Sequence, residues 1–412
     1  MALGKVGDAK KTAAWLMSVS SQDGKGGLYW HDYIDDNNTS KDVYTSFDDG
    51  TIGIGDFFWQ LYEKTNDPQY KQVYIEGLNW TVSQAEPYSK DGLSGYRWKW
   101  NVTDPNSPYY MGMGEGAAGI TYALADGYQR LQHSDPDVAN RCKKYMNGSL
   151  AFIESVRQEL AKNIGSGPAI PETGVVGQDG DTELDSGYLH GAAGDAFMYM
   201  HLYEIFHDKQ DFDHATELLD YLSDDQHGPM VKVSNNAVTW RLALDPRGGN
   251  NNRYATGFEE GNAGIGWVFL QAYKLTGNNT YLQLAERAGN WLINVAVKGQ
   301  DSSLTWHENE NPVNPLVHAN LNNGAAGIGV FMRDLYLANG KQSYQTAAKG
   351  AYKGIVSSAK FKAGDIYWQD NGGNDPYSND PSWHWGLSGI AEFAQRLNGG
   401  LQDIPGEQPA LR

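Results

Sequence analysis

The chain has 412 residues, with 32 Lys or Arg against 50 Asp or Glu, which gives a formal net charge of -18. Nucleic-acid binding depends mostly on cations that neutralise phosphates, so this balance argues against a nucleic-acid partner. No uncharged apolar run reaches the roughly 18 residues that a membrane helix needs, so we expect no membrane insertion. The one cysteine, Cys142, leaves no internal disulfide and no multi-cysteine zinc site.

The elements at the start of the chain follow a definite order. An amphipathic helix is predicted over residues 8–18, and a Gly- and Asn-rich loop carrying Trp30 follows it. The sequence DGTIGIG then starts at Asp49, and an apolar run starts at Phe57. A run that is apolar on nearly every side is typical of a buried helix, whereas the amphipathic helix has one face towards solvent.

This order recurs along the whole chain. The glycine signature is repeated as EGAAGIT, HGAAGDA, EGNAGIG, NGAAGIG and WGLSGIA, with first glycines at Gly50, Gly116, Gly191, Gly261, Gly324 and Gly386. Amphipathic helices are predicted to start at Asp67, Asp135, Asp211, Asn278 and Lys341, four of them at an Asp or Asn that can cap the helix. Such periodicity predicts six inner and six outer helices closing into one ring, and therefore a single domain over residues 1–412.

The repeated signature resembles that of the lanthionine synthetase C (LanC-like) family over essentially the entire chain. The resemblance implies an all-α (α/α)6 toroid, a double-layered barrel of helices with β-like loops at one rim. It also implies a catalytic zinc held by a cysteine before the fourth signature and a Cys-His pair before the fifth. Those positions hold Glu259, Asn322 and Asn323 here, so the chain is a divergent member that lacks the zinc ligands.

One functional position of the family is retained. The His-Gly of the third signature matches the acid/base histidine of the family, which the resemblance places at His190. A histidine near a helix start is also a common hydrogen-bonding residue of purely structural kind, and both interpretations stay open. No sequence motif calls for a cofactor.

The residues before the signature glycines are candidates for a catalytic site. If the ring closes, they converge on one mouth: Asp48 and Asp49, Glu115, His190, Glu259 and Glu260, Asn322 and Asn323, and His384 and Trp385. A carboxylate at a helix start is stabilised by the helix dipole, so Asp49, Glu115 and Glu260 could serve as capping residues only. Paired carboxylates across a cavity are what glycoside cleavage uses. We therefore take Glu260, Glu259, His190, Glu115 and Asp49 as catalytic candidates.

Aromatic residues in the loops could stack on sugar rings, because their faces pair with the C–H side of a pyranose. The substrate-binding candidates are Trp30, Trp98, Trp306, Trp368, Trp383, Trp385, His384, Asn322, Asn323, Tyr254 and Arg253, with Trp100 and Tyr110 in the same loops. Additional loop carboxylates stand at Asp32, Asp181, Glu183, Asp185 and Glu308. The alternative is that each repeated Trp only anchors its loop to the barrel.

Three functions remain open from the sequence. The leading hypothesis is a zinc-independent carbohydrate-active enzyme, a glycoside hydrolase or lyase with an acidic, aromatic-lined cavity. The second is a metal-free, cyclase-like enzyme that modifies peptides, with His190 as acid/base, and the third is a non-catalytic protein that binds a glycan or another protein. Six N-x-[ST] sequons, at Asn37, Asn38, Asn79, Asn101, Asn147 and Asn278, favour a secreted or cell-surface protein over a cytoplasmic one. We expect a monomer.

Overall fold

The computed structural model describes residues 6–32, 41–90, 92–164, 167–169, 183–244, 250–299, 301–310, 313–314, 316–362, 365–368 and 387–398. Contacts between residues divide the chain into two compact units. Unit 1 comprises Leu3–Glu183 with Leu189–Ala215, and unit 2 comprises Leu184–Tyr188 with Thr216–Arg412. The prediction of a single domain stays a prediction.

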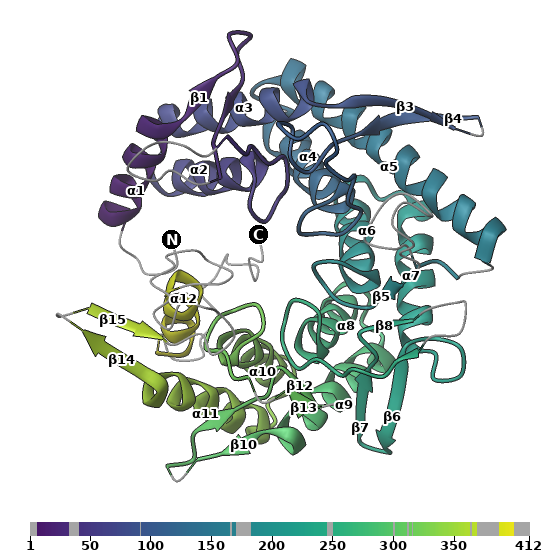
Figure 1. The fold of residues 1–412 in the computed structure, drawn as a ribbon, viewed down its shortest axis with the longest axis vertical. Coiled ribbons are helices and arrows are strands. Elements are labelled where there is room, and N and C mark those ends of the chain that lie inside the picture. Colours follow the sequence, from purple (N-terminus) through teal and green to yellow (C-terminus); the bar gives the residue numbers. More distant parts are fainter. Residues whose placement is uncertain are drawn as a thin grey trace. The chain divides into compact units, whose positions relative to one another are not determined.

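Two kinds of helix alternate along the described residues (Figure 1). The signature helices, which begin at the glycine signatures, are α2 (Thr51–Thr65), α4 (Ala117–Leu131), α6 (Ala192–Phe206), α8 (Asn262–Thr276), α10 (Ala325–Asn339) and α12 (Leu387–Asn398). The partner helices are α1 (Val6–Val19), α3 (Pro68–Ser83), α5 (Pro136–Ile164), α7 (Lys209–Ser223), α9 (Asn279–Val295) and α11 (Gln342–Ser358). The predicted alternation of helices is therefore confirmed. No helix in the described residues is both long and apolar enough to cross a membrane.

The described strands pair in short antiparallel hairpins, except that β5, β8 and β9 form one three-stranded antiparallel sheet. The strands are β1 (Ser21–Gln22), β2 (Leu28–Tyr29), β3 (Glu86–Lys90), β4 (Leu93–Arg97), β5 (Leu184–Asp185), β6 (Met230–Ser234), β7 (Ala237–Trp240), β8 (Ala243–Leu244), β9 (Asn250–Asn251), β10 (Val297–Lys298), β11 (Leu304–Thr305), β12 (Asn309–Glu310), β13 (Val313–Asn314), β14 (Ala359–Lys362) and β15 (Asp365–Trp368). Each repeated Trp lies at the end of a hairpin's second strand or directly after it. The predicted β-like run before each Trp is thus confirmed.

The signature helices α2, α4, α6, α8 and α10 begin without a side-chain cap. Their N-cap residues are the first signature glycines, whose backbone is extended, as at Gly261 with φ -111° and ψ -168°. The next backbone N–H instead donates to a loop carbonyl seven residues earlier, from Thr51 to Tyr44 O at 3.1 Å and from Asn262 to Ala255 O at 3.0 Å. Ala117 and Ala325 repeat this bond to Tyr110 O and His318 O. The loop is therefore folded back onto the helix start by its own backbone.

The second signature glycine is required by the same fold-back. A Cβ on Gly264 would lie 1.9 Å from the carbonyl oxygen of Phe258, and one on Gly119 would lie 2.1 Å from that of Met113. The same contact recurs at Gly53 and at Gly327. These distances are too short for any side chain. The path of the loop therefore requires glycine as the second glycine of these signatures.

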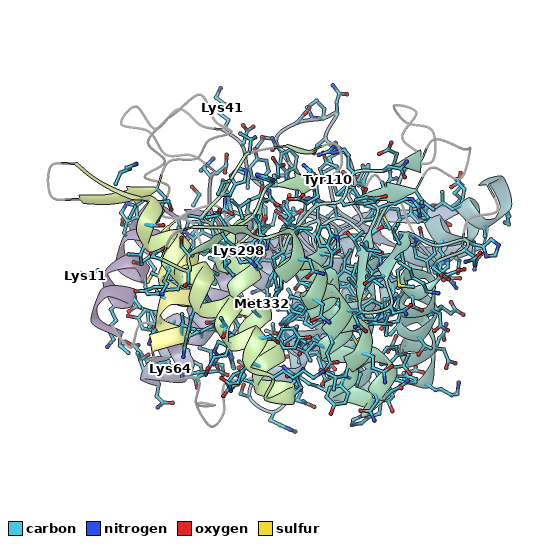
Figure 2. The ribbon with its side chains drawn as sticks, turned by 90° about the horizontal axis from the view of Figure 1, so that it is seen from below. Lys11, Lys41, Lys64, Tyr110, Lys298 and Met332 are labelled. Carbon is cyan, nitrogen blue, oxygen red and sulfur yellow. The ribbon has the colours of Figure 1, made fainter. Side chains whose placement is uncertain are left out.

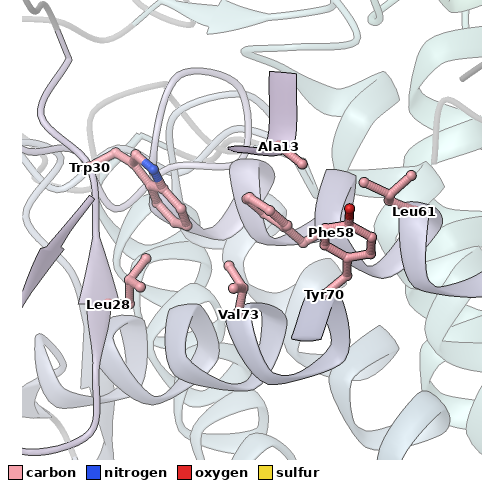
Figure 3. Packing of buried hydrophobic residues seen from close by; sticks show 7 residues of the cluster. All are labelled: Ala13, Leu28, Trp30, Phe58, Leu61, Tyr70 and Val73. Atoms are coloured by element: carbon pink, nitrogen blue, oxygen red, sulfur yellow. The ribbon is translucent and has the colours of Figure 1, made fainter. Parts of the chain in front are cut away.

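The core of unit 1 continues from the first helices into the first hairpin. Trp30 and Phe58 stack with ring centroids 5.8 Å apart, and Ala13, Leu61 and Val73 pack around them (Figure 3). All five side chains are buried. Burying apolar surface of this kind contributes roughly 25 cal/mol for each Å², so these contacts hold α1, α2 and α3 together.

An ionic network joins the three signature helices of unit 1. Arg130 of α4 contacts Asp56 of α2 at 2.6 Å and Asp126 at 2.7 Å. The Asp126 carboxylate also lies 2.9 Å from Nε2 of His201 on α6. Removing one partner from a buried network leaves an uncompensated charge, which costs about 3 to 5 kcal/mol. Apolar patterning gave no indication of this network, although its polar residues interrupt otherwise apolar helices.

We expect Gly264→Ala to lower the free energy of unfolding by about 2 kcal/mol or more, because the new Cβ collides with the Phe258 carbonyl. Gly7→Ala is the matched control, since a Cβ there meets nothing within 4 Å and Ala favours a helix by about 1 kcal/mol. Chemical denaturation of both variants measures the difference. Equal stability of the Gly264→Ala variant and the unsubstituted chain would contradict the fold-back of the loop.

A second prediction concerns Asp195, a buried carboxyl in the first turn of α6, where burial raises the pKa to about 8. Between the ordinary pKa near 3.8 and about 8 the folded state binds the proton that the unfolded state releases, so stability falls as the pH rises. Asp195→Asn is expected to stabilise the fold by about 2 kcal/mol or more above pH 8, and the gain should shrink as the pH falls from about 8 towards 3.8. Asp137→Asn, on the exposed first turn of α5, is the control. A pH-independent effect of Asp195→Asn would contradict the prediction.

Candidate functional site

The loops that carry the predicted catalytic residues are bonded to one another through their backbones. In unit 1 the N–H groups of Phe47 and Asp48 donate to Gly114 O at 3.1 and 3.0 Å, and Gly114 N–H donates to Leu189 O at 2.9 Å. In unit 2 the N–H of Tyr188 donates to Glu259 O at 2.7 Å, and that of Glu259 donates to Asn322 O at 3.0 Å. Each acceptor carbonyl belongs to the residue two positions before a first signature glycine. Within each unit these bonds therefore hold consecutive signature loops side by side.

Three further glycines allow this close approach, and the sequence analysis missed them. Gly112, Gly187 and Gly257 each lie four residues before a first signature glycine. A Cβ would lie 2.8 Å from the His190 Cα at Gly112, 2.6 Å from the Glu260 Cα at Gly187, and 2.6 Å from the Asn323 Cα at Gly257. A repeated Gly at this offset was the signal that could have revealed the contact between loops.

The candidates of unit 1 therefore lie on three loops that are bonded in succession. Asp49 is exposed, whereas Glu115 and His190 are half-buried. The candidates of unit 2 are arranged in the same way, with Glu260 and Asn323 half-buried and Glu259 and Asn322 buried at 6% and 2% exposure. That all these residues converge on one mouth stays a prediction. What the structure shows is that the signature loops within each unit are bonded to one another.

The surroundings of the Asp49 carboxyl favour its protonated form. Burial among protein atoms raises the pKa of its carboxyl, and the neighbouring Asp48 charge raises it further, against the opposing hydrogen bond from the Ser46 hydroxyl. The side chain remains accessible to solvent. A carboxyl that is accessible and keeps its proton to higher pH than usual is suited to protonate a substrate.

An aromatic pair lies beside Asp49. The rings of Tyr44 and Trp100 are stacked, with centroids 4.4 Å apart and planes at 12°, and Tyr110 meets Trp100 edge-on at 5.7 Å. Burial and the charges of Asp32, Asp42, Asp49 and Glu115 raise the pKa of the Tyr44 phenol to about 12. Tyr44 was absent from the candidates, although it has the same offset from its signature as Tyr110. Figure 2 places Tyr110 at the opposite end of unit 1 from Lys64, in the last turn of α2.

The repeated loop Trp residues have a different role. The indole N–H of each donates to a carbonyl near the end of the preceding partner helix: Trp30 to Leu16, Trp98 to Thr81, Trp240 to Leu222, Trp306 to Leu292 and Trp368 to Ile355, at 2.6 to 2.8 Å. All but the half-buried Trp368 are at most 4% exposed. We call them anchor Trp residues. Their indole bonds fix the hairpins, and their buried rings present little surface; substrate binding by these residues stays a prediction.

The remaining candidates fall in two groups. In unit 2 Tyr254 is half-buried and Arg253 is exposed, and their carbonyls accept from Glu310 and Leu242 at 3.0 and 2.9 Å. Trp383, His384 and Trp385, like the loop carboxylate Asp181, lie outside the described residues.

The zinc site of the cyclases does not fit this chain. Of the three positions concerned, Asn322 and Asn323 carry amides, which are poor zinc ligands, and Glu259 is the one ionisable side chain. Over the part of the chain that the structure describes, no group of three His, Cys, Asp or Glu side chains is arranged to hold a metal ion. The thiol of Cys142 is buried, and burial raises its pKa to about 12, so it does not act as a nucleophile.

We expect Trp306→Phe to lower the free energy of unfolding by about 1 kcal/mol, because it removes the hydrogen bond to Leu292 O but keeps a ring. Affinity for carbohydrate should not change, since Trp306 is an anchor. Trp15→Phe, on the exposed face of α1, is the control for stability. Reduced affinity at unchanged stability would return Trp306 to the substrate-binding residues.

Alternating helix pairs joined by hairpins at glycine signatures define an α/α protein. The chain belongs to the lanthionine synthetase C-like family, whose sequence profile matches residues 40–357 and, in a second alignment, residues 260–403. No curated protein matches the sequence.

Solved structures confirm the (α/α)6 toroid fold class. A sugar epimerase from a ruminal bacterium is 12% identical, with a TM-score of 0.64 over 96% of this chain and 99% of that one. A family GH76 α-mannanase of Bacteroides thetaiotaomicron is 16% identical, with a TM-score of 0.58 over 95% and 94%. Nisin cyclase is 15% identical, with a TM-score of 0.51 over 86% and 76%. Enzymes on carbohydrates and on peptides thus share the fold.

Proposed function

We propose that this protein is a zinc-independent, carbohydrate-active enzyme that hydrolyses glycosidic bonds. The observation that carries the proposal is the accessible Asp49 carboxyl, whose pKa is raised by burial and by Asp48 beside a stacked aromatic pair. Glycoside cleavage needs one carboxyl that keeps its proton and another that is ionised. We assign these two roles to Asp49 and Glu115, which lie on loops of unit 1 that are bonded to each other.

The roles follow from the environment of each group. Asp49 is the general acid that protonates the leaving oxygen, and Glu115, on the next signature loop, is the second carboxylate, acting as nucleophile or base. His190, on the loop bonded to Gly114, orients Glu115 or the substrate. The ordered backbone bonds from Asp48 to Gly114 and from Gly114 to Leu189 hold these groups in place before substrate binds.

The acidic pair of unit 2, Glu259 and Glu260, is a second candidate for the same acid and nucleophile roles. It occupies the same positions before the fourth signature as Asp48 and Asp49 before the first. Glu259 is the more buried of the two. Replacing Glu260 with Gln in the assay below decides whether this pair takes part.

The comparisons support a sugar as substrate without naming one. The mannanase and the sugar epimerase match nearly the full chain with higher TM-scores than nisin cyclase does. Family membership favours a second function, a metal-free cyclase-like modification of a peptide with His190 as acid/base. We also propose that the protein is secreted, because the chain carries six N-x-[ST] sequons.

Hydrolysis of a polysaccharide panel that includes mannan tests the proposal. Asp49→Asn should lower kcat/KM by about 100-fold or more, because an amide cannot deliver the proton. Asp137→Asn on α5 is the matched control and should keep full activity. If no glycan is cleaved, or if Asp49→Asn is as active as the control, the proposed hydrolysis is wrong.

The pH profile supplies a second readout from the same assay. Activity should fall as the pH rises through the raised pKa of Asp49, since the acid must be protonated. Asp48→Asn removes a charge that raises this pKa, so the alkaline limb should move to lower pH with little change in stability.

A further inference from the structure

A second backbone hydrogen bond between loops recurs along the chain, and at one of its occurrences two aromatic side chains lie together. The backbone N–H five residues before a signature glycine donates to the carbonyl two residues after the next anchor Trp. This bond runs from Thr45 to Trp100 O at 3.1 Å in unit 1. In unit 2 it runs from Ser186 to Leu242 O and from Thr256 to Glu308 O, at 3.0 and 3.1 Å. We call each of these bonds a crossing.

The side chains at a crossing vary while the backbone stays the same. Two positions define each crossing: the residue that precedes the N–H donor, and the residue that supplies the carbonyl. In unit 2 they hold Asp185 and Leu242 at one crossing, and Ala255 and Glu308 at the other. At the crossing of unit 1 they are Tyr44 and Trp100. Among these three crossings only Tyr44 and Trp100 place two aromatic rings together, so the backbone does not require the pair.

Anchoring the loop does not explain Trp100 either. Trp98, two residues earlier, is 4% exposed and already donates its indole N–H to Thr81 O at 2.7 Å. Trp100 and Tyr44 are both half-buried, in contrast to the buried anchor Trp98. The stacked pair is therefore not needed to anchor the loop.

The pair is also rigid. Trp100 N–H donates to Pro108 O at 3.0 Å, Thr45 Oγ1 donates to Lys99 O at 2.9 Å, and Tyr44 pairs with Asn101 in an antiparallel bridge. Aromatic side chains fixed in this way lose little conformational entropy when a ligand binds. A flat, rigid ring with accessible surface is what the C–H face of a pyranose stacks on.

Carboxylates lie close to the pair. Asn101, the bridge partner of Tyr44, donates from Nδ2 to Asp42 Oδ1 at 2.8 Å, and the Asp32 N–H donates to Asp42 O at 3.0 Å. Lys99, the nearest lysine along the chain, directs its Nζ to Pro105 O at 2.9 Å. An anionic sugar at this position would be repelled, whereas an amine-bearing sugar would gain from both the carboxylates and the ring faces.

We propose that Tyr44 and Trp100 form a sugar-stacking subsite that accepts uncharged and amine-bearing pyranoses and excludes uronic acids. The inference rests on the proposed function, because it places this subsite beside the acid Asp49. It assigns the substrate class: glycans without carboxylate, sulfate or phosphate groups.

Calorimetric titration of the full chain carrying Asp49→Asn tests the subsite apart from turnover. The probes are a mannose tetrasaccharide, a glucosamine tetrasaccharide and a galacturonic acid tetrasaccharide. The first two should bind, and the third should bind about tenfold or more weakly. Salt at about 1 M, where the Debye length is about 3 Å, should narrow that gap. Asp32→Asn should also narrow it by removing one of the repelling charges.

Substitution of the ring supplies the matched comparison. Trp100→Ala should weaken binding of the neutral probe about 3- to 10-fold, as expected for one stacking contact. Trp15→Ala, which removes a Trp that is 56% exposed on α1, should leave Kd unchanged. Trp100→Phe keeps a ring and should retain most of the affinity. If Trp100→Ala does not fold, Trp100→Leu, which removes the ring but keeps apolar volume, replaces it and should lose affinity to a similar extent.

The outcomes separate the subsite from the proposed hydrolysis. Equal Kd values for Trp100→Ala and Trp15→Ala, equal binding of neutral and uronic probes, or no binding of any probe would overturn the subsite. Binding with the expected dependence on Trp100, in a protein that cleaves no glycan, would keep the subsite and remove the hydrolysis.

Discussion

The structure depends on one contact between the backbone and itself, the return of each loop onto the start of its signature helix. At the starts of α2, α4, α8 and α10 no side chain caps the helix, and the first helical N–H donates to a carbonyl seven residues back. That path brings another carbonyl within about 2 Å of where a Cβ would be, as Phe258 O does at Gly264. Glycine is needed there for space, and its low helix propensity is offset by the closed loop.

Because backbone groups make the bonds between loops, side chains at the same positions are free to differ. The residue before each first glycine is Asp49, Glu115, His190, Glu260 or Asn323 on an unchanged framework. The crossings vary in the same way, from Tyr44 with Trp100 to Ala255 with Glu308. A fold of this kind accommodates a zinc cyclase, a mannanase and an epimerase, since the chemistry is carried by positions that the scaffold does not constrain.

The sequence predicted the architecture well because the architecture is repeated. Six glycine signatures, apolar runs after them and a Trp before most of them correspond to signature helices and anchored hairpins. The site was harder to predict. From the sequence, a Trp near a signature could either bind substrate or anchor its loop. Trp30, Trp98 and Trp306 are buried, and each indole N–H donates to a helix carbonyl, so these residues are anchors.

Contacts between repeats were beyond the reach of a linear reading. Tyr44 and Trp100 are far apart in sequence and meet only because Thr45 bonds to the Trp100 carbonyl. The network of Arg130, Asp56 and His201 likewise joins three helices, and its residues are isolated polar positions in apolar runs. Local pattern cannot pair such residues, because pairing is set by which loops and helices become neighbours.

The 29-residue helix α5 shows how this arrangement absorbs changes in length. The partner helices α3, α9 and α11 have 16 or 17 residues, and the spacing of the signatures is widest, at 75 residues, across α5. The bonds from Asp48 to Gly114 and from Gly114 to Leu189 are nevertheless made on both sides of it. A longer partner helix therefore leaves the bonds between the signature loops intact, so the length of α5 can change without rebuilding the loops that carry Asp49, Glu115 and His190.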